Sequence, residues 1–176
     1  IDITVNDVIP SLVTYDPSSF TETRGTSMTS VTPTYQGGTV ISWSINPALP
    51  TGLNLDATTG EISGTPTVIS PTPVTYTITA TNTGGSATTT IDITVNDIAP
   101  SSLTYSPNNF VLTVGTPMST LSPIASGGPI TSWGITLGLP AGINFDFATG
   151  EFSGTPSAVT SQIDITVTAT NSGGST

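Results

Sequence analysis

Alternation of apolar and polar residues is the most regular feature of this chain. In the segment Ile1–Asp7 the first, third and fifth residues are apolar, and the same letters return at Ile91–Asp97. A period of two places the apolar side chains on one face of a β-strand. Each copy is followed by a proline, Pro10 or Pro100, which lacks the N–H donor that a central strand needs. The motif is therefore predicted to be a strand that closes one unit and leads into the next.

Further strands with one buried face are predicted by the same pattern. Trp43 lies among the apolar positions of Ile41–Ile45, and the apolar residues of Val74–Ala80 alternate with threonines, whose branched Cβ suits an exposed sheet face. Glycine and proline interrupt the chain about every 8 to 12 residues, a spacing typical of all-β sandwiches. No stretch has helical periodicity, so we predict an all-β chain.

The chain repeats itself at an offset of 90 positions, which pairs Trp43 with Trp133. After one deletion the offset becomes 89 and pairs Ala80 with Ala169. Such a repeat within 176 residues predicts two tandem sandwiches. We expect residues 1–7 to be the closing strand of a preceding unit or a donor strand. Residues 8–97 then form sandwich 1, and residues 98–176 form sandwich 2 without its closing strand.

Two interpretations account for a chain that starts with a closing strand and whose second sandwich lacks one. The chain is a window on a longer tandem array, or Ile1–Asp7 completes the last sandwich of a neighbour by strand addition, as in donor-strand complementation. On the second interpretation an assembly strand enters beside an acceptor strand, and both are marked by alternating apolar residues. These residues are Ile1, Ile3 and Val5 in the assembly strand and Ile163, Ile165 and Val167 in the acceptor strand.

The composition restricts the chemistry that the chain can perform. It has eleven carboxylates, a single cationic side chain at Arg24, and no histidine or cysteine. This excludes histidine-based triads, thiol nucleophiles and ordinary zinc or copper sites. The net charge of −10 disfavours nucleic acid and anionic membranes as partners. No apolar run is long enough to insert into a membrane. We therefore predict a non-enzymatic chain with no required cofactor.

Several residues admit both a functional and a structural interpretation. Trp43 and Trp133 could stack against sugars, but their place on apolar strand faces favours core packing. Asp56 and Glu61 could form a catalytic carboxylate pair, yet no aromatic cleft is evident beside them. Asp56 and its counterpart Asp146 precede turn residues, which favours hydrogen bonds of the Asx-turn type. The glycine pairs, such as Gly37 and Gly38, are predicted to form hairpin turns.

Both units resemble the putative-immunoglobulin repeat of bacterial and archaeal surface proteins, a relative of the dystroglycan-type cadherin-like module. The resemblance is carried by the run GGTVISWSINPALPTGLNLDATTGEISGTP and by YTITATNTGGSATTTIDITV after it. It implies Ig-like, cadherin-like β-sandwiches in an extracellular multi-repeat chain. The function expected is that of a structural repeat of a filament, stalk or surface protein, joined end to end by IDITVND strands to copies of itself or to further repeats.

An alternative function is a calcium-dependent adhesin arm that binds a receptor or glycan. The segments ITVNDVIP and ITVNDIAP resemble the inter-domain linker of cadherins, where Asn and Asp oxygens bind calcium. The candidate ligands are residues of the two motifs, namely Asn6, Asp7, Asn96 and Asp97. Asp16 and Glu22 could supplement them in the first unit, but their counterparts Ser106 and Leu112 carry no carboxylate.

Overall fold

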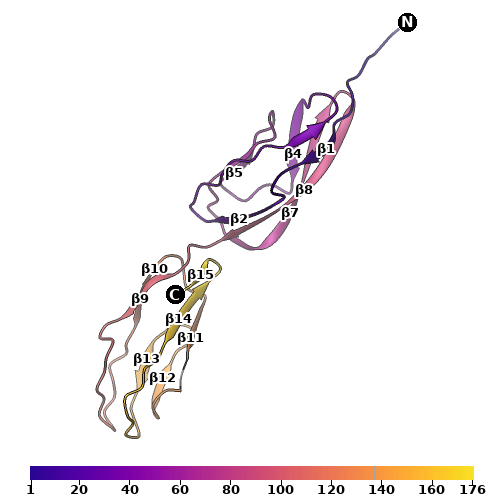
Figure 1. The fold of residues 1–176 in the computed structure, drawn as a ribbon. Coiled ribbons are helices and arrows are strands. Elements are labelled where there is room, and N and C mark those ends of the chain that lie inside the picture. Colours follow the sequence, from indigo (N-terminus) through magenta and orange to yellow (C-terminus); the bar gives the residue numbers. More distant parts are fainter. Residues whose placement is uncertain (137) are drawn as a thin grey trace. The chain divides into compact units, whose positions relative to one another are not determined.

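The computed structural model describes residues 1–136 and 138–176 and divides the chain into two compact units, residues 1–96 and 97–176 (Figure 1). Strands, turns and loops make up the described residues, and no helix occurs among them. Each unit is a β-sandwich, so the predicted all-β class with two tandem sandwiches is confirmed.

Unit 1 consists of a four-stranded sheet and two antiparallel ribbons around one apolar core. The sheet has the order β2-β8-β7-β4, in which β2 and β8 are parallel and the other neighbours antiparallel. The ribbons are β1-β3 and β5-β6. Its strands are β1 (Ser11–Thr14), β2 (Ser19–Thr23), β3 (Thr34–Gln36), β4 (Ser42–Asn46), β5 (Leu53–Leu55), β6 (Ile62–Gly64), β7 (Ser70–Asn82) and β8 (Gly85–Asn96).

The long hairpin β7-β8 forms because both strands alternate apolar residues with threonine or other polar residues. Asn82 pairs with Gly85, which leaves a two-residue loop between the strands. The Asn82 side-chain oxygen accepts hydrogen bonds from the N–H groups of Gly84 and Gly85 at 2.8 and 3.2 Å. This turn fixes the register of the hairpin and therefore which side chains of β8 face the core.

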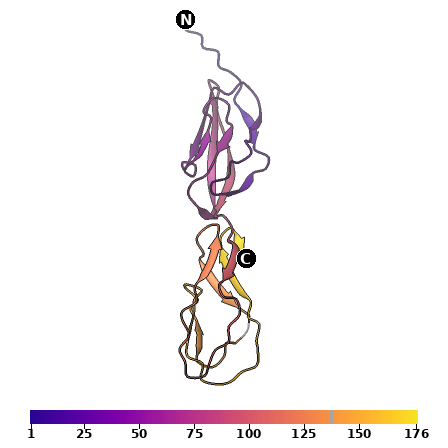
Figure 2. The same ribbon diagram turned by 90° about the vertical axis from the view of Figure 1, so that its left-hand side faces the viewer.

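Unit 2 repeats this plan with less strand. It contains the sheet β11-β14-β15 and the ribbons β9-β10 and β12-β13. In Figure 2 long stretches of this unit carry no strand arrows, and its strands are shorter than the hairpin β7-β8 of unit 1. Its strands are β9 (Ser101–Tyr105), β10 (Pro123–Ser126), β11 (Ser132–Ile135), β12 (Ile143–Phe145), β13 (Phe152–Gly154), β14 (Val167–Asn171) and β15 (Gly174–Ser175).

The two tryptophans differ in burial. Trp43 on β4 is 4% exposed, as predicted for a core residue. Trp133 on β11 occupies the equivalent place opposite Ala169 but is only half-buried, so the prediction of equal burial is wrong for this residue. One reason is the loss of an aromatic cover. Tyr35 packs edge-on against Trp43 with ring centroids 5.7 Å apart, whereas the counterpart of Tyr35 in the second repeat is Ala125.

The glycine pair Gly37 and Gly38 does not form a hairpin turn, contrary to the sequence prediction. It connects β3 to β4, and these strands pair with other neighbours. Gly37 has φ 91°, so a residue without Cβ is favoured there. A Cβ on Gly38 would collide with the Asp7 carboxylate and the Val8 carbonyl oxygen. The pair is thus required by the close approach of the segment that enters the unit.

Candidate functional site

The closing strand β8 supplies the centre of the unit 1 core. Its apolar face consists of Ile91, Ile93 and Val95, which are 1%, 1% and 0% exposed. On one side Ile93 lies opposite Val74 of β7, and on the other it lies opposite Phe20 of β2. The segment Ile91–Asn96, predicted to be the closing strand of its unit, therefore pairs with the strand before it in the sequence. The motif lies between β2 and β7 in the sheet and pairs with both strands.

Among the described residues of unit 2, the strand that corresponds to the start of β8 is β15. The strand β15 pairs with the end of β14, where Ser175 lies opposite Thr170, and Thr176 exchanges two backbone hydrogen bonds with Ala169 at 2.9 and 3.0 Å. Within the described part of the chain, no strand pairs with this side of β14 before Ala169. The backbone edge of β14 toward Val167 is thus open on the side that β8 occupies in unit 1.

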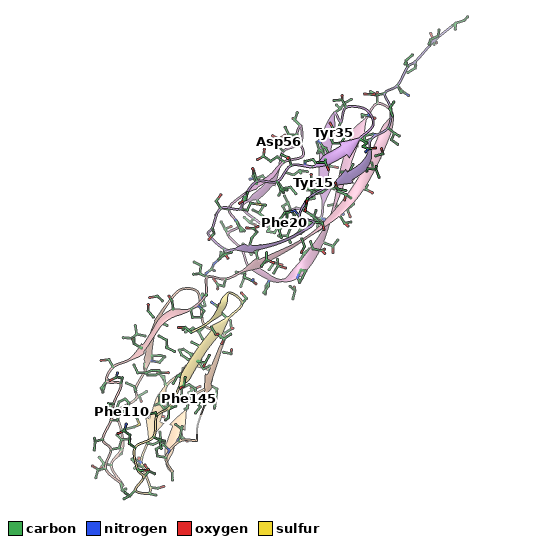
Figure 3. All side chains as sticks on the ribbon, viewed as in Figure 1. Tyr15, Phe20, Tyr35, Asp56, Phe110 and Phe145 are labelled. Atoms are coloured by element: carbon green, nitrogen blue, oxygen red, sulfur yellow. The ribbon has the colours of Figure 1, made fainter. Side chains whose placement is uncertain are left out.

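Side chains that lie beside the closing strand in unit 1 have exposed counterparts in unit 2, and Figure 3 labels one such pair, Phe20 and Phe110. Phe20 is 7% exposed, but its counterpart Phe110 is 41% exposed and belongs to no strand. Leu112, the counterpart of Glu22, is 39% exposed. A cavity of about 300 Å³ opens beside these residues and is also lined by Met118 and Leu121. In unit 1 the strand β8 lies between Phe20 and Glu22 of β2 and Val74 and Tyr76 of β7. We call the counterparts of these four residues in unit 2, Phe110, Leu112, Ile163 and Ile165, the strand groove.

The predicted acceptor and assembly residues have the following environments. Ile163 is 39% exposed, while Ile165 and Val167 are half-buried; of the three only Val167 lies in a strand, at the start of β14. The assembly residues Ile1, Ile3 and Val5 are all open to solvent, and Ile3 is 83% exposed. They lie in an extended segment that runs away from the body of unit 1 without a strand partner (Figure 1).

The last residue of each motif begins the following sandwich. The backbone N–H of Asp7 donates to the Thr83 hydroxyl at 3.0 Å, and its Oδ1 accepts the N–H of Val8 at 2.8 Å. The Val8 carbonyl then accepts the Asn82 amide at 2.7 Å. Asp7 is thereby fixed to the β7-β8 turn of its own unit.

Unit 2 repeats this arrangement around Asp97. Its N–H donates to Ser172 at 2.9 Å, its Oδ1 accepts the N–H of Ile98 at 2.8 Å, and Asn171 donates to the Ile98 carbonyl at 2.8 Å. Asn82 and Asn171 are each only 6% exposed. Sequence reasoning missed both asparagines, although their recurrence in ATNTGGS and ATNSGGS was a signal that could have revealed them.

The four candidate calcium ligands lie in different structural elements and environments. Asn6 is exposed in the extended segment, and Asn96 ends β8. Asp97 is 4% exposed, and one oxygen of each aspartate already accepts a backbone N–H. Among the described residues, no group of three or more His, Cys, Asp or Glu side chains is arranged to hold a metal ion. The calcium site remains a prediction of the sequence.

The aspartates before the Thr-Gly turns make the predicted Asx-type bonds. Asp56 Oδ1 accepts the N–H groups of Thr58 and Thr59 at 2.7 and 2.9 Å, and Asp146 accepts those of Ala148 and Thr149. The bond from the Thr59 backbone is the largest of the contributions that lower the pKa of Asp56. These contacts support the structural interpretation of Asp56 over a catalytic one.

The glycine of the same turn joins two aromatic side chains. Tyr15 donates its hydroxyl to the Gly60 carbonyl at 2.6 Å, and burial raises the pKa of Tyr15. A Cβ on Gly60 would lie 2.7 Å from the Trp43 ring, so the indole packs directly on the glycine. In unit 2 Tyr105 bonds to Gly150 at 2.7 Å, and burial raises the pKa of Tyr105 to about 12.

Comparison with known proteins identifies the type of unit. The family model described as Putative Ig domain matches the chain twice, at residues 10–96 and 100–176. The chain belongs to this Putative Ig domain family. Its two matches coincide with the two sandwiches, so each unit is one family domain, and the resemblance proposed from the sequence motifs is confirmed.

Relatives of these Ig-like domains include adhesins. The chain is 33% identical over 134 residues to the "Serine-rich adhesin for platelets" of Staphylococcus aureus strain MRSA252, which covers 72% of this chain and 9% of that protein. For the protein of the same name in strain USA300 the identity is 35% over 129 residues, covering 68% of this chain and 5% of that protein. The chain thus spans a small part of the length of these relatives.

Solved structures similar to the Ig-like pair include cadherin ectodomains. Drosophila N-cadherin EC1-4 matches 95% of this chain and 47% of that chain, with a TM-score of 0.45 and 13% identity. Human Protocadherin-24 EC1-2 matches 87% of this chain and 79% of that chain, with a TM-score of 0.44 and 14% identity.

The described residues include no helix that is both long and apolar enough to cross a membrane.

Proposed function

We propose that the chain is a non-enzymatic structural repeat of an extracellular, adhesin-type surface protein or filament. In this function the strand groove of unit 2 takes a strand of the pattern Ile-x-Ile-x-Val. The observation that carries the proposal is the role of Ile91–Asn96, which closes unit 1 with the same sequence as the exposed segment Ile1–Asn6. The same motif is thus paired and buried at Ile91–Asn96 but exposed and without a strand partner at Ile1–Asn6.

Burial of the motif explains why the groove would bind it. Three apolar side chains would leave water, each contributing about 1.5 to 3 kcal/mol. The strand would also pair with the open edge of β14 and with the segment at Phe110, as β8 pairs with β7 and β2. A slip of one residue would turn Ile1, Ile3 and Val5 outward, so the register is specific. An open apolar groove with an unpaired edge otherwise invites non-specific association.

The family supports the remaining parts of the proposal. Ig-like domains and surface adhesins are non-enzymatic kinds of protein, and the adhesin relatives favour an extracellular location. The acidic surface, with a net charge of −10, gives no basis for binding nucleic acid. The partners that we propose are further repeats of the same kind, either in one chain or in another copy.

The test separates binding at the groove from the source of the strand. A peptide with the sequence of Thr88–Asn96 is titrated into the Ile3→Asp chain, which cannot offer its own apolar motif. Chemical shifts of unit 2 amides should change at Phe110, Leu112 and Ile163, while those of unit 1 stay in place. Absence of any shift in unit 2 would refute the groove.

Sedimentation of the unaltered chain then identifies the source. Association that increases with concentration and disappears in the Ile3→Asp chain would show strand exchange between copies. A chain that binds the peptide but stays monomeric would show that the strand comes from further repeats joined covalently. The matched control is Val8→Asp, which adds the same charge near the motif without altering its apolar face.

A further inference from the structure

A hydrogen bond between two side chains accompanies closure of unit 1. Thr75 on β7 lies directly opposite Asp92 on β8, and its hydroxyl donates to the Asp92 carboxylate at 2.6 Å. Asp92 is the second residue of the closing motif and corresponds to Asp2. The cross-strand partner of Asp92 is thus a hydroxyl group, which can donate a hydrogen bond to the carboxylate.

The counterpart of Thr75 in unit 2 is a carboxylate. Trp43 lies opposite Ala80 and Trp133 opposite Ala169, so the position five residues before the alanine is Thr75 in one unit and Asp164 in the other. The register continues beyond β14, because the Thr136 N–H donates to the Thr166 carbonyl at 3.1 Å. A closing strand in the register of β8 would therefore place its second residue opposite Asp164.

We infer that Asp164 is a specificity-determining residue of the strand groove, which rests on the proposed function. It disfavours an entering strand with an acid at the second position, as in Ile1–Asp7, and favours one with a hydrogen-bond donor there. Like charges directly opposite on paired strands are destabilising. The groove thus prefers a strand that differs from Ile1–Asp7 at this one position.

The neighbours of Asp164 offer no charge that would offset a second carboxylate. Gln162 donates weakly to the Asp164 carboxylate at 3.4 Å. On the other side of the entering strand, the counterpart of Ser19 opposite Asp92 is Asn109. Gln162 and Asn109 both carry uncharged amide side chains. Neither of them could offset the repulsion between Asp164 and a second carboxylate on the entering strand.

A two-by-two comparison tests the inference. Peptides with the sequence of Thr88–Asn96, carrying either Asp or Asn at the place of Asp92, are titrated into the Ile3→Asp chain with and without Asp164→Thr. With Asp164 present, the Asn peptide should bind about two- to five-fold more tightly than the Asp peptide. Asp164→Thr should remove or reverse this preference, because it restores the pairing seen between Thr75 and Asp92.

The control is Glu151→Gln, which removes one negative charge from the same unit at a residue that does not belong to the strand groove and keeps an oxygen that can accept the Ser122 hydroxyl. It should leave the preference unchanged. Equal preference with and without Asp164→Thr would overturn the inference while peptide binding itself still supports the groove. Failure of both peptides to bind any variant would overturn the proposed function, and the inference with it.

Discussion

Phe20 and Ile93 lie opposite each other on the parallel strands β2 and β8, and both are buried, at 7% and 1% exposure. Their contact explains why the equivalent Phe110 is exposed, since among the described residues no strand pairs with its segment. Closure of the sandwich therefore depends on one strand whose apolar face completes the core.

The two copies of the motif should differ in their effect on unit 1. Ile93→Ala should destabilise unit 1 by about 2 to 5 kcal/mol, because it opens a cavity at a fully packed site. Ile3→Ala should leave the unfolding of unit 1 unchanged, since Ile3 is 83% exposed. Urea unfolding followed by Trp43 fluorescence, with Trp133 replaced by Phe in both variants, measures both. A comparable loss for Ile3→Ala would contradict the separate roles of the copies.

Restoring the missing aromatic should bury Trp133. Ala125→Tyr places a ring where Tyr35 covers Trp43, and it should fill part of the 380 Å³ cavity that Ala125 and Trp133 line. An aromatic pair adds about 0.5 to 1.5 kcal/mol. Indole emission should shift to shorter wavelength and resist acrylamide quenching. The reciprocal change Tyr35→Ala should expose Trp43, and an unaltered spectrum in both variants would disprove this account of Trp133.

The turn at Asp56 should make unit 1 sensitive to acid. Hydrogen bonds from Thr59 and Thr58 lower the pKa of Asp56 in the folded state below its unfolded value. The stabilisation is thus complete above the unfolded pKa and is lost as the pH falls through the folded one. Asp56→Ala should destabilise unit 1 at pH 7 and lose this part of the acid dependence, as thermal melts between pH 7 and pH 2 would show.

The matched variant is Asp56→Asn, which keeps an oxygen that can accept the two N–H groups but carries no charge. It should retain most of the stability at pH 7 while losing the same acid dependence. Equal destabilisation by Asn and Ala would mean that the charge, and not the turn geometry, is what matters at this position.

Calcium should have little effect on the folded units. Asp7 and Asp97 each use one carboxylate oxygen within the loop that starts their sandwich. We expect the melting temperatures of the chain in calcium and in chelator to agree closely. A stabilisation of several kcal/mol, read through the linkage between binding and unfolding, would instead favour the calcium-dependent adhesin arm.

The sequence alone determined the class, the repeat and the closing motif. Alternation in Ile91–Asp97 and in Val74–Ala80 fixes which side chains face inward, because the period of a strand is two. The internal repeat sets the length of each unit, and the short polar turns at Asp56 and Asp146 depend on bonds between near neighbours. All of these features are local or recur along the chain, so they can be inferred without the fold.

Only the tertiary structure decided which long-range contacts each repeat makes. The bonds of Asp7 to Thr83 and of Asp97 to Ser172 join residues more than 70 positions apart. The unequal burial of Trp43 and Trp133 depends in part on a single difference between the repeats, Tyr35 in unit 1 and Ala125 in unit 2. This residue lies on a ribbon, whereas the tryptophan lies on the main sheet. The inferred opposition of Asp164 to an entering strand rests on the register in which β14 pairs with β11. Such contacts arise when distant strands meet in one sandwich, and no local pattern encodes them.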